Sequence, residues 1–245
     1  MPHPNATRYL TLADRLLPGR ITAFYLVGSA ALGAFRPRRS DLDFVALTSG
    51  EVNARGLHYA RMLLGFPTVN GVFVHQDDVA RPVTTIRPLA SSTGLHYRPG
   101  QGFDVNPVQW LVLRDHGIAL RGPHPRELNL DPEPARLREW NLANLNGYWA
   151  AYAEAMRHRR VRRAEIAWAT LCSPRLHCTI ATGRVITKEA AGEYALATFP
   201  ETHHRVIREG LAYRRGEPPL MRDARERALA ASDLVRAVIA GAIDL

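Results

Sequence analysis

The sequence predicts an α/β (α+β) N-terminal domain with a mixed sheet, followed by an all-α helical bundle. In the first hundred residues, three short runs rich in β-branched and aromatic residues alternate with helical patterns. After about residue 105 the sequence consists of amphipathic segments that contain few β-forming residues. Alternation of strands and helices is typical of an α/β domain. We therefore expect one domain over residues 1–125 and a second, helical domain over 126–245.

The N-terminal elements follow from local patterns, in chain order. Residues 8–18 carry apolar side chains at helical spacing and are stopped by Pro18-Gly19, so they predict a helix. Gly28-Ser29 turns the chain after the first apolar run. The further predictions are strands over 21–27, 40–48 and 68–76, one or two helical turns over 30–35, and a helix over 54–65.

The second half is predicted to be helical. Residues 107–117 read as a helix that ends at a glycine, and Arg121-Gly-Pro-His-Pro then breaks the chain, which puts the domain boundary near 121–135. Five further helical segments follow, over 133–163, 164–183, 187–199, 202–216 and 222–243.

The composition narrows the class of protein. A chain of 245 residues with 46% apolar and 22% charged residues can bury a sizeable core. No apolar run approaches the ~18 residues that a membrane helix needs, and the start lacks a signal-peptide pattern. We therefore expect a cytoplasmic protein without a membrane partner, monomeric or dimeric, with Cys172 and Cys178 as reduced thiols.

The charge of the chain favours an anionic ligand. The formal net charge is +9, and Lys188 is the only lysine, so nearly all the positive charge comes from arginine. An arginine surplus has two explanations, a bias of genomic base composition or a nucleotide or nucleic-acid ligand. Either way, the surplus counts against a strongly cationic substrate.

The segment "GSAALGAFRPRRSDLDF", residues 28–44, has the pattern of a triphosphate and metal site. In a strand, Asp41 and Asp43 would share one face, where a hard divalent cation such as Mg²⁺ would offset their repulsion. Gly28 lets the backbone approach a phosphate closely, and the hydroxyl of Ser29 adds a donor. Ser40 stands at the entrance of the strand, where it can cap it or contact a phosphate.

The pattern as a whole resembles the aminoglycoside nucleotidyltransferases of the streptomycin/spectinomycin adenylyltransferase kind, within the DNA polymerase β-type superfamily. The resemblance rests on "LVGSAALGAFRPRRSDLDFVAL", "FVHQDDV", "LRDHGIALRGP" and "TGRVITKEAAGEYAL", and spans roughly residues 20–215. It implies that Mg²⁺, ATP and a small hydroxylated acceptor bind in a cleft between two domains. AMP would move to the acceptor hydroxyl, and pyrophosphate would leave.

The resemblance also implies roles for single residues. Ser29 and Ser40 would contact the triphosphate, while Asp41 and Asp43 would hold the metal. Three residues of the helical domain match positions that contact the nucleotide in the family, namely Arg175, Lys188 and Tyr213.

One expected catalytic group is replaced. The family carries a third carboxylate, the general base, on the strand before "VFVH", where this sequence has Val69 and Asn70. An asparagine cannot take a proton at neutral pH, although it can orient a hydroxyl or a water. Asp43 itself is one substitute. The others are Asp77, Asp78, Asp104 and Glu165, of which Glu165 stands ten residues before Arg175, where the family carries an acidic acceptor-binding residue.

Two questions stay open at the level of sequence. Residues 157–163 hold five arginines, which disfavours a polycationic acceptor and favours a less cationic or anionic one. The alternatives to a small-molecule nucleotidyltransferase are a catalytically impaired nucleotide-binding protein, suggested by Asn70, and nucleotidylation of RNA or protein, suggested by the arginine surplus.

Overall fold

The computed structural model describes residues 3–245. Contacts along the backbone divide the chain into two compact units, with the division between Pro134 and Ala135. The N-terminal unit contains a mixed six-stranded sheet, and the C-terminal unit is helical. The predicted fold class is therefore confirmed.

The strands lie in the order β5-β4-β3-β2-β1-β6. The central β2 pairs antiparallel with β1 and parallel with β3, while all the other pairs are antiparallel. This arrangement makes the sheet mixed. The bounds are β1 Ile21–Val27, β2 Leu42–Thr48, β3 Val69–His75, β4 Ala90–Thr93, β5 His96–Pro99 and β6 Ile118–Arg121.

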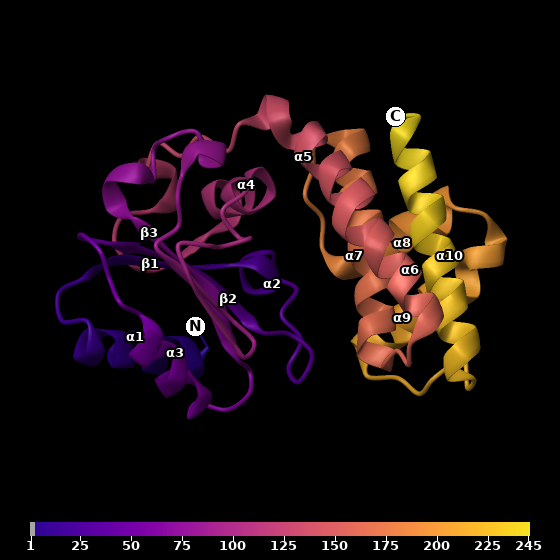
Figure 1. Cartoon of the computed structure of the whole chain (residues 1–245), viewed down its shortest axis with the longest axis horizontal. Helices are drawn as coiled ribbons and strands as arrows, with labels where there is room; N and C mark the ends of the chain where they lie inside the picture. The colour runs from indigo at the N-terminus through magenta and orange to yellow at the C-terminus, as the bar shows by residue number, and fades with distance from the viewer. Residues whose placement is uncertain (1–2) are drawn as a thin grey trace. The chain divides into compact units, whose positions relative to one another are not determined.

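Helices cover both faces of this sheet (Figure 1). On one face, α1 (Pro4–Leu16) and α3 (Arg55–Met62) pack over an aromatic core, in which the rings of Phe24 and Phe44 stack with their centroids 4.9 Å apart. On the other face lies α4 (Pro107–His116). Because side chains alternate along a strand, Phe44 points to the first face and its neighbour Asp43 to the second.

Two parts of the sheet were not predicted. The hairpin of β4 and β5 is made of four-residue strands with few large apolar residues. Residues 118–121, expected to lie in a helical region, form β6, because they complete the sheet by pairing with β1. Both departures are cases in which tertiary pairing overrides a weak local pattern.

Short helices join the elements of this unit. Directly after β1 comes α2 (Gly28–Ala31), the observed counterpart of the helical turns predicted for 30–35. The remaining single turns are η1 Gln76–Asp78, η2 Val83–Thr85, η3 Pro125–Glu127 and η4 Pro134–Arg136.

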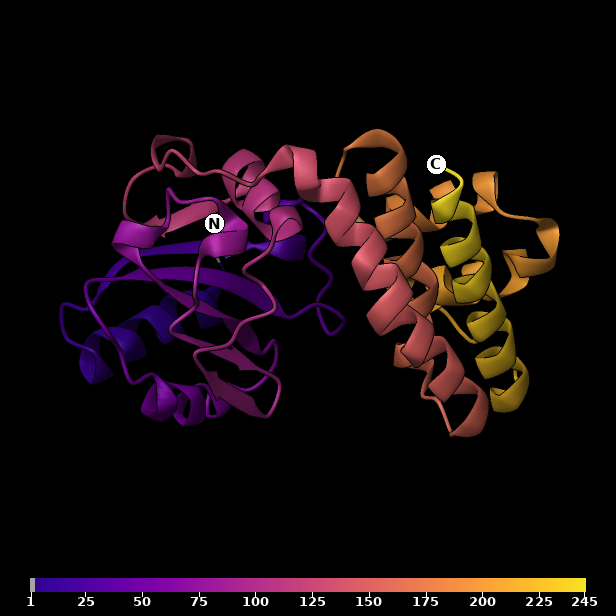
Figure 2. The ribbon, with the colours of Figure 1, turned by 45° about the horizontal axis from the view of Figure 1, so that its top comes forward.

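The helical unit begins with a continuous rod, visible in Figure 2, in which a π-helical turn joins two α-helices. Its core is apolar and closes around the buried side chains of α7 and α10. The bounds are α5 Leu137–Asn144, η5 Leu145–Trp149, α6 Ala150–His158, α7 Arg163–Thr182, α8 Lys188–Thr198, η6 Glu201–His203, α9 His204–Arg215 and α10 Ala224–Ile243.

Local signals explain where these helices end. Gly183 and Gly216 close α7 and α9 with left-handed backbone conformations, φ +68° and +81°. The side chains of Thr187 and Asp223 cap the starts of α8 and α10. Cys172 and Cys178 are buried and free, as expected. No helix in residues 3–245 has the length and apolarity to span a bilayer.

Candidate active site

The candidate site is centred on the contact between Gly28 and Asp43. In the register of β1 and β2, Val27 pairs with Asp43, so Gly28 follows directly beside the carboxylate. A Cβ on Gly28 would lie 2.2 Å from Oδ2 of Asp43, and Gly28 has a left-handed φ of +58°. Both the space and the conformation therefore require glycine at the start of α2.

Asp41 lies one residue before β2, and its carboxylate is exposed. Its Oδ1 accepts a hydrogen bond from the hydroxyl of Thr68, and the backbone of Leu42 donates to the carbonyl of Thr68 at 2.8 Å. Leu42 is buried, whereas Asp41 is exposed and Asp43 is half-buried. This alternation is the one that two carboxylates on one face require.

The two serines occupy different environments. Ser29 lies half-buried in α2, whereas Ser40 is only 4% exposed. The hydroxyl of Ser40 accepts the backbone N–H of Arg36 at 3.0 Å, and its own N–H donates to the carbonyl of Arg36 at 2.9 Å. Ser40 thus closes the loop that leads into Asp41, and we expect its hydroxyl to shape that loop.

The donor set fits a magnesium ion that is held partly by a substrate. In residues 3–245 there is no group of three or more histidine, cysteine or acidic side chains that could hold a metal. Asp41 and Asp43 would supply two oxygen ligands, which matches the usual way in which Mg²⁺ binds one or two carboxylates together with substrate phosphates. Because Gly28 has no side chain, its backbone can lie directly beside the carboxylate of Asp43.

Asn70 lies next to Asp43 in the parallel pairing of β2 and β3. Its side chain is 7% exposed, and its Oδ1 accepts hydrogen bonds from Nη1 of Arg61 and from the backbone of Gly94, both at 3.1 Å. The guanidinium of Arg61 also donates to the carbonyl of Val69 at 2.9 Å. The amide oxygen of Asn70 is thus fully engaged in structural bonds.

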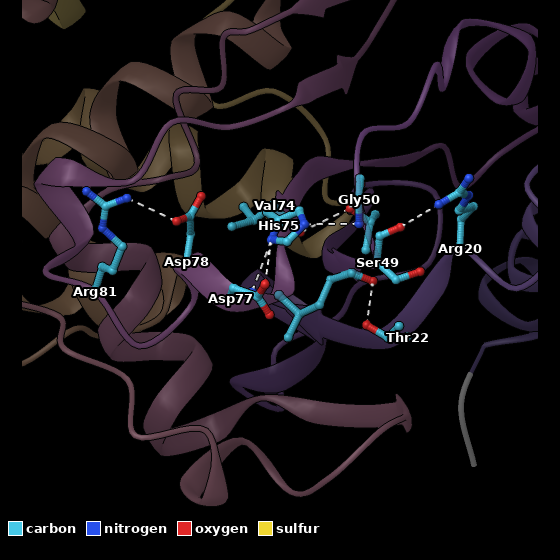
Figure 3. Close-up of polar contacts among 11 residues, drawn as sticks. Arg20, Thr22, Ser49, Gly50, Val74, His75, Asp77, Asp78 and Arg81 are labelled. Atoms are coloured by element: carbon cyan, nitrogen blue, oxygen red, sulfur yellow. Dashed lines mark hydrogen bonds and ion pairs between the residues drawn. The ribbon is translucent and has the colours of Figure 1, made fainter.

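Asp77 and Asp78 lie at the opposite end of β3 (Figure 3). Thr48 pairs with His75, so both aspartates follow the far end of β2, about 16 Å along the strand from Asp43. Asp78 is paired with Arg81 at 3.0 Å, and Oδ2 of Asp77 lies 3.6 Å from Nδ1 of His75. A general base must reach its proton within about 3 Å, so these two residues are unsuitable.

Asp104 precedes α4, in the segment after β5. Burial raises the pKa of its carboxyl above the ordinary value. A Cβ on the nearby Gly102 would lie 2.8 Å from Val72, which places this segment against the same sheet face as Asp43 and Asn70. A raised pKa makes a carboxylate a better base, so Asp104 stays a candidate for the missing base.

Glu165, in the first turn of α7, is held by four hydrogen bonds. Its Oε1 accepts from Arg159 at 2.7 Å and from the hydroxyl of Tyr152 at 3.2 Å. Its Oε2 accepts from the backbone and from Nε of Arg162, at 3.0 and 3.2 Å. Burial would raise the pKa of Glu165, but the bonds from both arginines outweigh it and lower the pKa to about 2. This carboxylate is a weak base and has no lone pair left for a cationic ligand.

The three residues expected at the nucleotide lie on three packed helices of this unit. Arg175 is half-buried on α7, Lys188 begins α8, and Tyr213 is near the end of α9. An ion pair of 3.1 Å joins Glu189 to Arg214, the residues that directly follow Lys188 and Tyr213. The start of α8 is thereby tied to the end of α9.

The helical unit is similar to a known protein domain. Residues 146–238 match the family model described as the C-terminal domain of aminoglycoside adenylyltransferases. The helical unit is therefore similar to that domain. The resemblance drawn from the sequence motifs is therefore confirmed.

The fold of nearly the whole chain is similar to that of a solved structure. The solved structure of the spectinomycin adenyltransferase AAD(9) from Enterococcus faecialis, determined with ATP and spectinomycin, matches with a TM-score of 0.74. The match covers 96% of this chain and 98% of that one, at 14% sequence identity, so it establishes the fold. No curated protein sequence matches the chain.

The sequence interpretation missed two residues that shape the candidate site. Arg61 is 3% exposed, and it binds both Asn70 and the carbonyl of Gly94. The signal was its helical spacing from the apolar Leu57, which places it on the buried face of α3. Thr68, which donates to Asp41, had no comparable signal.

Proposed function

We propose that this protein is a magnesium-dependent nucleotidyltransferase that moves AMP from ATP to a hydroxyl of a small acceptor and releases pyrophosphate. The observation that carries the proposal is the glycine cradle beside Asp43, with Asp41 at the same strand end. The adenylyltransferase domain of the helical unit and the shared fold support it. The relative solved with ATP makes ATP the first nucleotide to test.

Each site residue of the N-terminal unit has its own role in this proposal. Asp41 and Asp43 hold Mg²⁺, which when bound neutralises charge on the triphosphate. Gly28 lets a phosphate oxygen approach the backbone, and the hydroxyl of Ser29 donates to the same group. Ser40 keeps the loop before Asp41 in place through its bonds to Arg36.

The chemical step exchanges one phosphorus–oxygen bond for another. The acceptor oxygen forms a bond to the α-phosphorus of ATP, and the bond from that phosphorus to the pyrophosphate oxygen breaks. The hydroxyl proton goes to Asp43, to Asp104 or to water, because the oxygen of Asn70 is engaged and cannot take a proton. In the helical unit, Arg175, Lys188 and Tyr213 would contact the nucleotide.

The acceptor that fits this chain is less cationic than a classical aminoglycoside. Glu165 is the acidic residue at the position of acceptor binding in the family, and here its oxygens are occupied by Arg159, Arg162 and Tyr152. An ammonium group would have to displace an arginine to reach it. A neutral or anionic acceptor needs no such exchange.

A second candidate function is supported by Asn70. General-base assistance is typically worth about 10²–10⁴ in rate, and the residue beside Asp43 is an engaged amide. A nucleotide-binding protein without turnover could act as a sensor or partner protein. It would need the residues that bind the metal and the phosphates, but no general base.

The first experiment is calorimetric titration of ATP with and without Mg²⁺. We expect magnesium-dependent binding by the wild type and its loss in Asp43→Asn. Asp77→Asn, a carboxylate at the far end of β3, is the matched control and should bind ATP normally. Pyrophosphate release over a panel of neutral, anionic and cationic acceptors then separates the two candidates. Equal ATP binding by the wild type and Asp43→Asn would contradict both.

A further inference from the structure

A polar hollow lies on the N-terminal unit, and neither Asp41 nor Asp43 lines it. It has a volume of about 450 Å³ and is formed by α3 and the β4–β5 hairpin. β5 is the edge strand, three strands from β2, so the hollow is separated from Asp43 by about 14 Å of sheet. Its volume is in the range of small-ligand sites.

Its lining is cationic and aromatic. Arg55 and Arg98 face it together with the rings of Tyr59 and Tyr97, and no acidic side chain lines it. The guanidinium of Arg55 lies 5.8 Å from the centroid of Tyr97. Within the described part of the chain, neither arginine has a carboxylate partner. The positive charge of this hollow is therefore available to an anion.

The wall of the hollow is rigid. His58 is 1% exposed, and its Nδ1 lies 2.7 Å from the hydroxyl of Ser92, which joins α3 to β4. Its ring packs against Tyr97 with the centroids 5.8 Å apart. By contrast, Tyr59 is 61% exposed, so one flat aromatic surface is presented to solvent. A preformed wall with one open ring suits a flat ligand that stacks on it.

We propose that this hollow is a binding site for an anionic ring compound of mononucleotide size. The ring stacks on Tyr59, and the anionic group lies between Arg55 and Arg98. The site is independent of the proposed magnesium and triphosphate site, because it uses neither aspartate and needs no metal. AMP is the natural probe, since it joins a flat ring to one phosphate.

The test uses Asp43→Asn in EDTA, so that nucleotide binding at the aspartates does not contribute. Calorimetry with AMP, adenosine and inorganic phosphate should show AMP binding at least about tenfold tighter than either fragment. In this background, Arg98→Ala should weaken AMP about tenfold and leave adenosine unchanged. Tyr59→Ala should weaken both AMP and adenosine.

Arg160→Ala is the matched control, because it removes an equally exposed arginine from the other unit and should change nothing. Arg98 and Tyr59 are exposed, so their variants should keep the wild-type circular dichroism spectrum and Tm. The proposal is overturned if AMP shows no saturable binding at millimolar concentration, or if Arg98→Ala binds AMP as tightly as its parent. Neither result would affect the magnesium-dependent ATP binding that tests the proposed function.

Discussion

Gly28 and Asp43 are in direct contact across the end of the β1–β2 pair, and the space between them is too small for a methyl group. A Cβ on Gly28 would lie 2.2 Å from Oδ2 and 3.0 Å from the carboxyl carbon of Asp43. A backbone that carries a side chain at this point would push the carboxylate out of place. The glycine therefore sets the position of a proposed metal ligand that lies fifteen residues later in the chain.

Gly28→Ala should destabilise the protein and abolish magnesium-dependent ATP binding. The left-handed backbone alone costs an alanine ~1–2 kcal/mol, and the clash with Asp43 adds to that. Gly33→Ala is the control, because Gly33 has a similar φ of +66° but no atom within 4 Å of the added methyl. Thermal unfolding and calorimetry of both variants check this, and equal losses would show that the contact with Asp43 is unimportant.

Asn70→Asp should fold normally at pH 7 without gaining activity. The new carboxylate would replace an oxygen that already accepts from Arg61 at 3.1 Å, so the guanidinium would keep its pKa low. Such a carboxylate is a poor base. Pyrophosphate release measured against the wild type is the readout, with Asn70→Leu as the structural control. The leucine variant removes an acceptor of the buried Arg61, which should cost roughly 1–3 kcal/mol. A rise in rate of about 100-fold in Asn70→Asp would identify this position as that of the missing base.

Glu165→Gln should destabilise the protein at neutral pH but not in strong acid. The pKa of Glu165 is lowered from 4.5 to about 2, so its ionised form contributes stability that is fully present above pH 4.5 and is lost as the pH falls toward 2. We expect a loss of roughly 1–3 kcal/mol at pH 7. Urea unfolding of wild type and variant at pH 7 and near pH 2.5 measures this difference.

Glu154→Gln provides the comparison for Glu165. Glu154 also pairs with two cations, His158 and Arg236, but its carboxylate is exposed. Solvent screens such a pair, so this variant should unfold nearly as the wild type does at both pH values. A Glu165→Gln variant whose loss of stability is the same at both pH values would contradict the assigned network.

Asp104→Asn should stabilise the protein at neutral pH. Burial raises the pKa of Asp104 above 3.8, so ionisation is more costly in the folded state than in the unfolded chain. Stability of the wild type therefore falls as the pH rises through this range, and the amide avoids that loss. A higher Tm for the variant at pH 7 than for the wild type, with no difference near pH 3, is the expected outcome.

Asp104→Asn also reports on catalysis. If Asp104 provides the base, pyrophosphate release should fall by about 10²–10⁴ while the affinity for magnesium-ATP stays unchanged. A variant that is more stable and equally active would assign Asp104 a structural position only.

The sequence predicted a strand correctly where the residues that favour the strand locally also pack into the core. The alternation from Leu42 to Phe44 marks a strand because the same residues fill the aromatic core, and the strand prediction is confirmed. The four-residue β6 has no such pattern, since Ile118 and Ala119 are exposed and the strand exists only through its pairing with β1. Short strands of this kind are recognisable only from their partners.

The candidate site likewise has a part that the sequence predicts and a part that it does not. The motif around Asp43 could be interpreted from residue types and spacing alone, because its chemistry is local. The role of Glu165 could not, since it depends on Tyr152 of α6 and on Arg159 and Arg162 of the following loop converging on one carboxylate. The hydrogen bonds to Asn70 could not be predicted either. They come from a buried arginine of α3 and from the turn of a hairpin that has no strong sequence signal.

The hydrogen bonds around Asn70 connect the centre of the sheet to its edge hairpin. Gly94, in the turn between β4 and β5, donates to Asn70, while Arg61 contacts both, and Asn70 lies beside Asp43. A ligand that shifts the hairpin thus strains the same strand that borders the two aspartates. If such a ligand changes the affinity for magnesium-ATP, thermodynamic reciprocity requires that magnesium-ATP change the affinity for that ligand by the same factor. The buried guanidinium of Arg61 is thus a structural link between the edge hairpin and the strand beside Asp43.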